Sequence, residues 1–436
     1  MDRQTNEEVT APAAKTAGIS RRSVLKYGAI ALASVSGVCA ATWHVMRRAA
    51  ASAASVFKKD APSGELWAQW QGRRWTKEAR HYRKLGPNVQ CLLCPNDCLL
   101  EPEDRGRCRN RINKDGKMYT LVYANPCSFG LDPIEKKPLF HFLPASKTFS
   151  LATSGCGFRC LNCQNWDISQ RKPEELKDPR GEEFRLRTTT LGMLNRPGVK
   201  DRLSLLPADA VSLAERMNCA SLAYTYSEPT VFYEYMYDTA KLAKARGIRN
   251  VWVTCGYINP DPLKELCEVI DAANVDLKGF DAAIYQKLNS GKLQPILDTL
   301  KTLKDRGVWF EVTNLVVPTY TDDLRVMADM CKWLVDNIGP DYPIHFSRFS
   351  PRHLLKHLPP TPIKTLLEAR EIARRAGLRY PYIGNVGGVK DAETTLCPKC
   401  EKTVVQRIGY TVEQVNIDKG ACKFCDTRIA GVWTPA

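Results

Sequence analysis

Residues 153–166 read TSGCGFRCLNCQNW and hold three cysteines, Cys156, Cys160 and Cys163, in the spacing C-x3-C-x2-C. Iron–sulfur sites normally use four cysteines, so three thiolates can hold a [4Fe–4S] cluster while one iron has no protein ligand. Reactive metal sites keep such an open position and structural sites close it, as zinc proteins show. The spacing therefore predicts a metal centre whose remaining position is filled by a small molecule. A zinc site or a chance spacing is the alternative.

The chain around this motif alternates short apolar runs with helical patterns over residues 148–390. Repeated strand–helix units predict an α/β fold, with a parallel sheet covered by helices. We expect a partial or full (β/α) barrel whose functional residues lie at the carboxyl ends of the strands. The expected strands span 148–155, 220–226, 250–256, 274–279, 309–318, 343–349 and 378–384. The expected helices span 207–219, 228–247, 261–273, 281–307 with a break near Gly291, 322–338 and 362–377.

An amino-terminal segment and one insertion within the repeat do not follow the strand–helix pattern. Residues 1–60 look like a twin-arginine signal or a membrane anchor, because SRRSVLK at 20–26 precedes a stretch, 27–46, without Asp, Glu, Lys or Arg. ASA at 51–53 offers a cleavage site. We expect the protein to be membrane-associated or exported. One alternative is that residues 1–60 anchor it on the cytoplasmic face of the membrane, and another is that they form an amphipathic or disordered tail. The polar insertion 167–206 is long for a loop and indicates a lid or a partly disordered segment.

The chain has 17 cysteines, of which eleven fall in three short-spaced sets that favour metal chelation over disulfides. A Cys-rich region at 65–147 carries Cys91, Cys94, Cys98 and Cys108. A second iron–sulfur cluster, a zinc ion or a purely thiol role all fit this set. A tail at 391–436 carries Cys397, Cys400, Cys422 and Cys425. The tail is typical of a zinc ribbon, with a rubredoxin-like iron as the alternative. We interpret most of the six isolated cysteines as small buried hydrophobic residues.

The cysteine motif after the first strand of a strand–helix repeat resembles the radical SAM superfamily. The resemblance implies that S-adenosylmethionine (SAM) chelates the unique iron of a [4Fe–4S] cluster. One electron then cleaves SAM to methionine and a 5′-deoxyadenosyl radical, which abstracts hydrogen from a substrate. The SAM-binding residues that the match implies are Ser227, Glu228, Thr254, Asp276, Lys278 and His345. Each of three residues also has a structural interpretation. Glu228 could be the acidic residue at a helix N-terminus, Lys278 a surface lysine and His345 a core histidine.

A narrower resemblance covers residues 75–436. CLLCPNDC, DPIEKKPLFHFLP, CGFRCLNCQNWDIS, YTYSEPT, HFSRFSPRH, YIGNVGG and the terminal CPKC…CKFC…GVW resemble, in this order, the AmmeMemoRadiSam system radical SAM enzyme. Asp276 and Lys278 also match the Asp-x-Lys of pyruvate formate-lyase activating enzymes. The resemblance implies a low-potential electron donor and partner proteins of the same system, with a small-molecule or protein substrate that the sequence does not name.

Two other functions compete with this interpretation. One is an activase that installs a glycyl radical on a partner protein. The other is a membrane-tethered iron–sulfur electron-transfer protein, which would cleave no SAM. The net charge of +16 is spread along the chain rather than gathered in one stripe, which argues against nucleic-acid binding.

Overall fold

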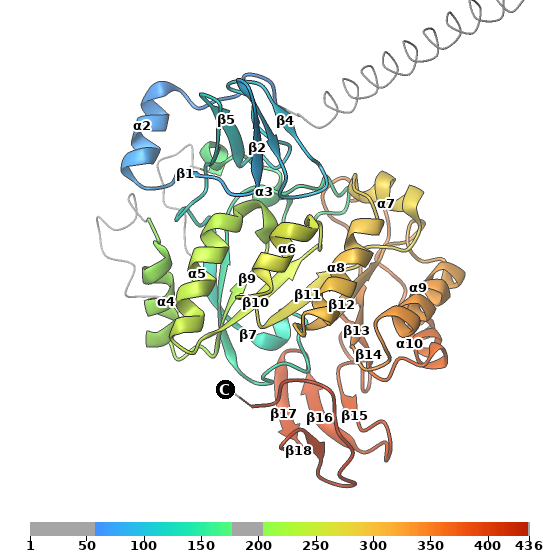
Figure 1. Ribbon diagram of the computed structural model, residues 1–436. Helices are drawn as coiled ribbons and strands as arrows, with labels where there is room; N and C mark the ends of the chain where they lie inside the picture. Colours follow the sequence, from blue (N-terminus) through green and yellow to red (C-terminus); the bar gives the residue numbers. More distant parts are fainter. Residues whose placement is uncertain (1–56, 177–203, 435–436) are drawn as a thin grey trace, which may run out of the picture. The chain divides into compact units, whose positions relative to one another are not determined.

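An eight-stranded sheet forms the centre of this computed structural model, which describes residues 57–176 and 204–434 (Figure 1). Strands β8 to β14 are parallel and follow one another in chain order, whereas β7 pairs with β8 in the antiparallel sense. The strands are β7 (Ser128–Pro133), β8 (Lys147–Ala152), β9 (Ser221–Tyr224), β10 (Arg249–Thr254), β11 (Ala272–Asp276), β12 (Trp309–Val316), β13 (Ile344–Arg348) and β14 (Pro381–Gly384). The predicted parallel α/β sheet is confirmed. Because β7 and β14 are the two edges of the sheet in the described chain, the barrel is partial rather than full.

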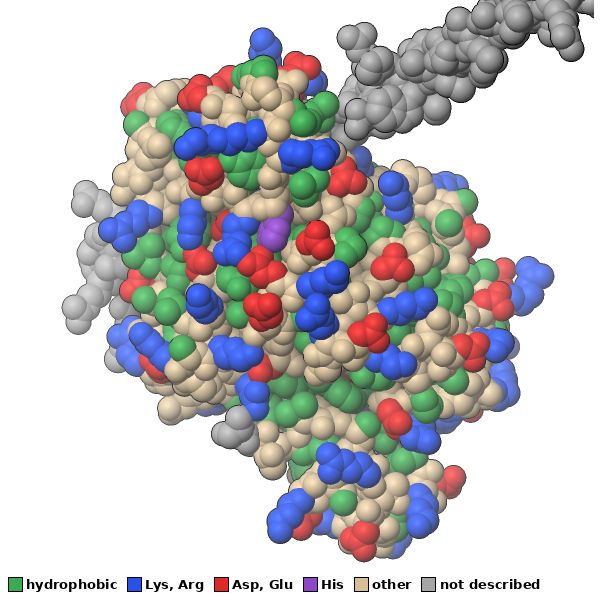
Figure 2. Space-filling view, viewed as in Figure 1, with side chains coloured by type: hydrophobic (Ala, Val, Ile, Leu, Met, Phe, Trp, Pro, Cys, Tyr) green, Lys and Arg blue, Asp and Glu red, His purple; other side chains and the backbone are tan. Residues whose placement is uncertain are grey.

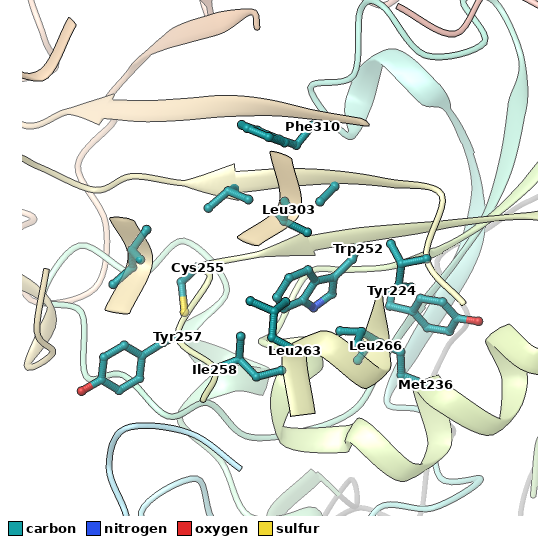
Figure 3. Packing of buried hydrophobic residues seen from close by; sticks show 14 of the residues in the cluster. Tyr224, Met236, Trp252, Cys255, Tyr257, Ile258, Leu263, Leu266, Leu303 and Phe310 are labelled. Atoms are coloured by element: carbon teal, nitrogen blue, oxygen red, sulfur yellow. The ribbon is translucent and has the colours of Figure 1, made fainter. Parts of the chain in front are cut away.

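Helices connect the parallel strands, and Figure 1 shows α5, α6 and α8 lying across one face of the sheet. Figure 3 shows the packing between these layers: Trp252 of β10 lies among Met236 of α5 and Leu263 and Leu266 of α6, all at most 2% exposed. Burying such large apolar side chains is the main stabilising contribution to the fold. The α-helices are α3 (Trp166–Ser169), α4 (Pro207–Arg216), α5 (Tyr233–Ala245), α6 (Pro260–Leu266), α7 (Ala282–Asn289), α8 (Gln294–Asp305), α9 (Leu324–Asn337) and α10 (Ile363–Ala376).

The bounds of α6, α7 and α8 test the helices predicted over 261–273 and 281–307. The predicted break near Gly291 is confirmed, since α7 and α8 are separate; a Cβ at Gly291 would lie within 3.0 Å of the Phe158 ring. The helix predicted over 261–273 is wrong at its end. It stops at Leu266, and Ala272 and Ala273 begin β11, fully buried between β10 and β12. Alanine favours helices intrinsically, but tertiary burial decided its conformation here.

Two three-stranded antiparallel sheets, β1-β6-β5 and β2-β3-β4, build the region before the main sheet. Its elements are α2 (Gly64–Gly72), β1 (Lys77–Glu78), β2 (Tyr82–Leu85), β3 (Asn88–Cys91), β4 (Leu99–Leu100), β5 (Arg111–Lys114) and β6 (Lys117–Thr120). Arg111 forms a buried ion pair with Glu234 of α5, and Asn259 before α6 donates its N–H to the carbonyl of Leu93 at 3.0 Å. Residues 128–133, part of the predicted region 65–147, form the edge strand β7 of the main sheet.

The last segment forms small antiparallel sheets from β15 (Thr395–Leu396), β16 (Thr403–Ile408), β17 (Thr411–Val415), β18 (Ile417–Asp418) and β19 (Ala421–Cys422). Val432 pairs through its backbone with His141 and Leu143, both links being 2.7 Å long. The Arg407 guanidinium donates to the carbonyl oxygen of Phe140. The segment therefore packs against residues 140–143 of the chain that connects β7 to β8.

Residues 1–56 and 177–203 lie outside the described chain, so the predicted twin-arginine signal or anchor and most of the 167–206 insertion are not part of this structure. Among the residues described, no helix combines the length and hydropathy needed to cross a bilayer. The face in Figure 2 interleaves basic with acidic side chains.

Candidate functional site

The three-cysteine motif lies in the loop that follows β8, at the carboxyl end of the sheet. Gly155 has a φ of +88°, and a Cβ there would come within 3.0 Å of the carbonyl oxygen of Cys108. Only glycine combines this backbone conformation with so close an approach. Phe158, also in the loop, packs on Tyr257 and Tyr285 with ring centroids 4.7 and 6.1 Å apart. These contacts hold the cysteine loop at the carboxyl end of the sheet, the position that the sequence predicted.

Each of the three thiols has a polar partner. The N–H of Phe158 lies 3.3 Å from the sulfur of Cys156, and Nδ2 of Asn289 lies 3.3 Å from the sulfur of Cys160. The hydroxyl of Ser169 lies 3.1 Å from the sulfur of Cys163. The three thiols are also near one another, because Cys160 and Cys163 both raise the pKa of Cys156, and Cys163 raises that of Cys160. Burial is the larger cause, and it raises the pKa of Cys160 to about 11. Such thiols lose their protons when a metal takes their place.

The spacing of these thiols suits a cluster better than a single ion. In the described residues, one group of three or more candidate ligands has its atoms within 4.8 Å of one another, and it is Cys397, Cys400, Cys422 and Cys425. The thiols at 156, 160 and 163 converge more loosely, as expected when each thiolate binds a different iron. The residues present therefore fit the predicted three-thiolate [4Fe–4S] site.

Glu228 follows β9 and is 5% exposed. Its Oε1 accepts hydrogen bonds from the N–H and hydroxyl of Thr230 at 3.0 and 2.6 Å, and from the hydroxyl of Thr254 at 2.7 Å. Its Oε2 accepts from the N–H of Cys255 at 2.8 Å. Glu228 is thus the N-cap of the short helix η3 (Pro229–Phe232), as the alternative interpretation held, and it also lies close enough to Cys156 to raise the pKa of that thiol.

Asp276 and Lys278 lie at the end of β11, and Lys278 Nζ is 2.7 Å from Asp276 Oδ2. Burial opposes the lysine charge, but Asp276 and the nearby thiols of Cys160 and Cys255 raise the pKa of Lys278 well above its usual value. Lys278 is therefore a protonated group next to the cysteine loop rather than an isolated surface lysine.

Three site residues were not predicted. Cys255, interpreted as an isolated hydrophobic residue, is 5% exposed and lies near Glu228, Cys156 and Lys278. Its only sequence signal is its place directly after Thr254 at a strand end. Helix α7 supplies Tyr285 and Asn289. The hydroxyl of Tyr285, Oδ1 of Asn289 and Oγ of Ser227 are buried polar atoms without a hydrogen-bond partner, so the site retains groups that a ligand can satisfy.

His345 is the second residue of β13 and lies apart from this group. Its Nε2 is 2.7 Å from Oε2 of Glu311, and its ring packs edge-on against Phe140. Both His345 and Glu311 side chains are at most 3% exposed. A buried histidine paired with the buried Glu311 fits the alternative in which His345 is a core residue. A role of His345 in binding SAM stays a prediction.

The chain is similar in sequence to known proteins. The family model described as the radical SAM superfamily matches residues 150–331. The uncharacterized protein MJ0808 of Methanocaldococcus jannaschii is 43% identical over 356 residues, which cover 81% of this chain and 98% of that protein. The pyruvate formate-lyase 1-activating enzyme of Escherichia coli K12 is 27% identical over 176 residues, or 39% of this chain and 61% of that enzyme. The chain belongs to the radical SAM superfamily.

Membership makes this protein a radical SAM enzyme, related to the activating enzymes, and implies a [4Fe–4S] cluster and SAM as cofactors. Among solved structures, a domain of a pyruvate-formate lyase-activating enzyme from Bacteroides vulgatus is 17% identical with a TM-score of 0.34, covering 38% of this chain and 99% of that one.

The carboxyl-terminal cysteines of this radical SAM enzyme form a compact group. The sulfurs of Cys397 and Cys425 are 3.5 Å apart, and those of Cys400 and Cys422 are 3.7 Å apart. A tetrahedral ion with metal–sulfur bonds of about 2.3 Å separates its sulfurs by about 3.8 Å. Hydrogen bonding with Thr427 lowers the pKa of Cys425 to about 6, which favours the ionised form that a metal ligand needs. The set could hold an additional metal ion.

Proposed function

We propose that this radical SAM enzyme cleaves SAM reductively at a [4Fe–4S] cluster held by Cys156, Cys160 and Cys163, and that the resulting radical abstracts hydrogen from its substrate. The observation that carries the proposal is the convergence of the three thiols beside Glu228 and Lys278, at the carboxyl end of the parallel sheet. An electron-transfer protein would need the thiols but not a carboxylate and an ammonium at the neighbouring strand ends.

The chain's own groups would position SAM. Oε2 of Glu228 accepts the N–H of Cys255, and a carboxylate oxygen has a second lone pair that can accept from the ammonium of the methionine moiety. Lys278 uses one of its N–H groups on Asp276 and can donate another to a carboxylate. The unpartnered hydroxyl of Ser227 can donate as well. When bound, the cluster would supply the single electron that breaks the C5′–S bond of SAM.

The test is anaerobic reconstitution of the full chain with iron and sulfide, followed by SAM and dithionite. We expect 5′-deoxyadenosine and methionine in equal amounts. The Cys156→Ala variant should form neither, while Cys267→Ser, which changes an isolated half-buried cysteine, should match the wild type. Absence of 5′-deoxyadenosine from wild-type protein with an intact cluster would disprove the proposal.

A second candidate, glycyl-radical activation of a partner protein, is favoured by the relation to pyruvate formate-lyase activating enzymes and by the Asp276-x-Lys278 pattern. It predicts that SAM cleavage leaves a glycyl radical signal in the electron paramagnetic resonance (EPR) spectrum of a partner protein. A small-molecule substrate would leave no such protein radical.

We further propose that residues 391–436 form a zinc ribbon, with mononuclear iron as the alternative, and that residues 1–60 act as an export signal or anchor. The 3.5 and 3.7 Å sulfur–sulfur distances support a single ion in the tail. Metal analysis of anaerobically and aerobically purified protein distinguishes zinc from iron. Cell fractionation, with mapping of the mature N-terminus near residue 53, tests the second part.

A further inference from the structure

The amino-terminal set of Cys91, Cys94, Cys98 and Cys108 differs in geometry from the carboxyl-terminal set. Its four thiols are mutually close, since in every pair one thiol raises the pKa of the other. Yet no three of them lie within 4.8 Å of one another, whereas the tail cysteines do. A single tetrahedral ion would draw its sulfurs to about 3.8 Å. The amino-terminal set thus shares the looser convergence of Cys156, Cys160 and Cys163 in the loop after β8, which we call the catalytic loop.

The surroundings of this set suit an anionic centre. Cys91, Cys98 and Cys108 are at most 8% exposed. Arg111 directs Nη1 to the sulfur of Cys91 at 3.5 Å. Arg109 has a buried Nη1 without a hydrogen-bond partner. Thiolate-bound iron–sulfur clusters are negatively charged, and a buried charge requires a partner of opposite sign.

The set also touches the catalytic loop. Asn96 and Arg107 both donate to the carbonyl of Gly157, at 3.1 and 3.2 Å. The carbonyl of Cys108 lies against Gly155, whose neighbour is Cys156. The contact between the Cys108 carbonyl and Gly155 therefore brings Cys108 of one set close to Cys156 of the other along the backbone. Arg109 and Arg159 each lie near both of these thiols.

We propose that Cys91, Cys94, Cys98 and Cys108 hold a second iron–sulfur cluster that passes electrons to the cluster of the catalytic loop. The inference rests on the proposed function for its role but not for its metal content. A protein donor of the flavodoxin or ferredoxin class would give one electron, reducing the second cluster. That cluster would be reoxidised by transfer of the same electron to the catalytic cluster, with no bond formed or broken.

The metal content is tested in the full chain with Cys156, Cys160 and Cys163 all changed to alanine. After anaerobic reconstitution, we expect about two or four iron atoms per chain, with equal sulfide, and an EPR signal after reduction. Finding zinc in place of iron at this set, or no metal, overturns the proposal. This count does not depend on SAM cleavage, so it can fail or succeed separately from the proposed function.

The electron route is tested with the double variant Cys98→Ser/Cys108→Ser, which keeps the catalytic loop. We expect the loss of the second cluster only, and at least a tenfold slower reduction of the catalytic cluster by a flavodoxin-class donor. Dithionite, a small reductant, should still support 5′-deoxyadenosine formation, which shows that the variant is folded. Cys267→Ser is the control. An unchanged rate with the protein donor overturns the relay.

Discussion

Asn289 donates its side-chain amide to the sulfur of Cys160 at 3.3 Å, from the last residue of α7. Hydrogen bonds to cluster sulfurs help to set reduction potentials, because they stabilise the more negative, reduced state. We expect Asn289→Leu to lower the potential of the catalytic cluster. A differential stabilisation of about 1.4 kcal/mol corresponds to about 59 mV for one electron. An EPR-monitored redox titration measures the shift. Gln286→Leu, on the same helix, is the control, and equal potentials in both variants would contradict the assignment.

Gly155 links the two cysteine-bearing regions through its contact with Cys108. Gly155→Ala should destabilise the fold, because the new Cβ meets the Cys108 carbonyl in a backbone conformation with a φ of +88°. Strain of this kind costs about 1–3 kcal/mol, and we also expect reduced iron content. Gly247→Ala separates the two causes: Gly247 has a φ of +72° but open space around its Cα. Denaturant unfolding measures both variants, and equal losses would show that the contact with Cys108 contributes nothing.

Glu228→Gln replaces one carboxylate oxygen by an amide that donates rather than accepts. Because hydrogen bonds to charged groups contribute about 1.5–3 kcal/mol, we expect SAM to bind roughly tenfold or more weakly. Iron content should stay unchanged, because Glu228 is not a predicted ligand. Equilibrium binding of SAM to the reconstituted protein gives the affinity, with the exposed Glu268→Gln as control. Wild-type affinity in Glu228→Gln would remove Glu228 from the SAM site.

The sequence predicted the parallel sheet and the cysteine loop because both signals are local: apolar strands alternate with amphipathic helices, and the three cysteines lie within one loop. The place of Tyr285 and Asn289 in the site could not be predicted, because a helical pattern does not indicate which of its residues the fold brings next to a loop distant in sequence. Cys255 had no neighbouring cysteine to mark it. The edge strand at 128–133 was missed because antiparallel pairing to β8 is a long-range choice that the strand–helix repeat does not encode.

His141 links the main sheet to the carboxyl-terminal segment, and burial lowers its pKa to about 4. The neutral ring donates Nδ1–H to the carbonyl of Ala430 at 2.7 Å and accepts at Nε2 from the hydroxyl of Tyr382 at 2.6 Å. An unfolded histidine has a pKa of about 6.5. Between these values the unfolded chain binds more protons than the folded chain, so acidification destabilises the fold.

From pH 7 to pH 5 this difference predicts a loss of about 2 kcal/mol in the free energy of unfolding from His141 alone. His141→Gln cannot take up a proton, so the variant should lose less stability over the same interval, although it should be less stable at pH 7. Urea unfolding at several pH values measures both slopes. His357→Gln, which changes an exposed histidine, should keep the wild-type slope. If His141→Gln kept it too, the ring of His141 would have to take up its proton between pH 7 and pH 5 in the folded protein as it does in the unfolded chain, and burial would not lower its pKa.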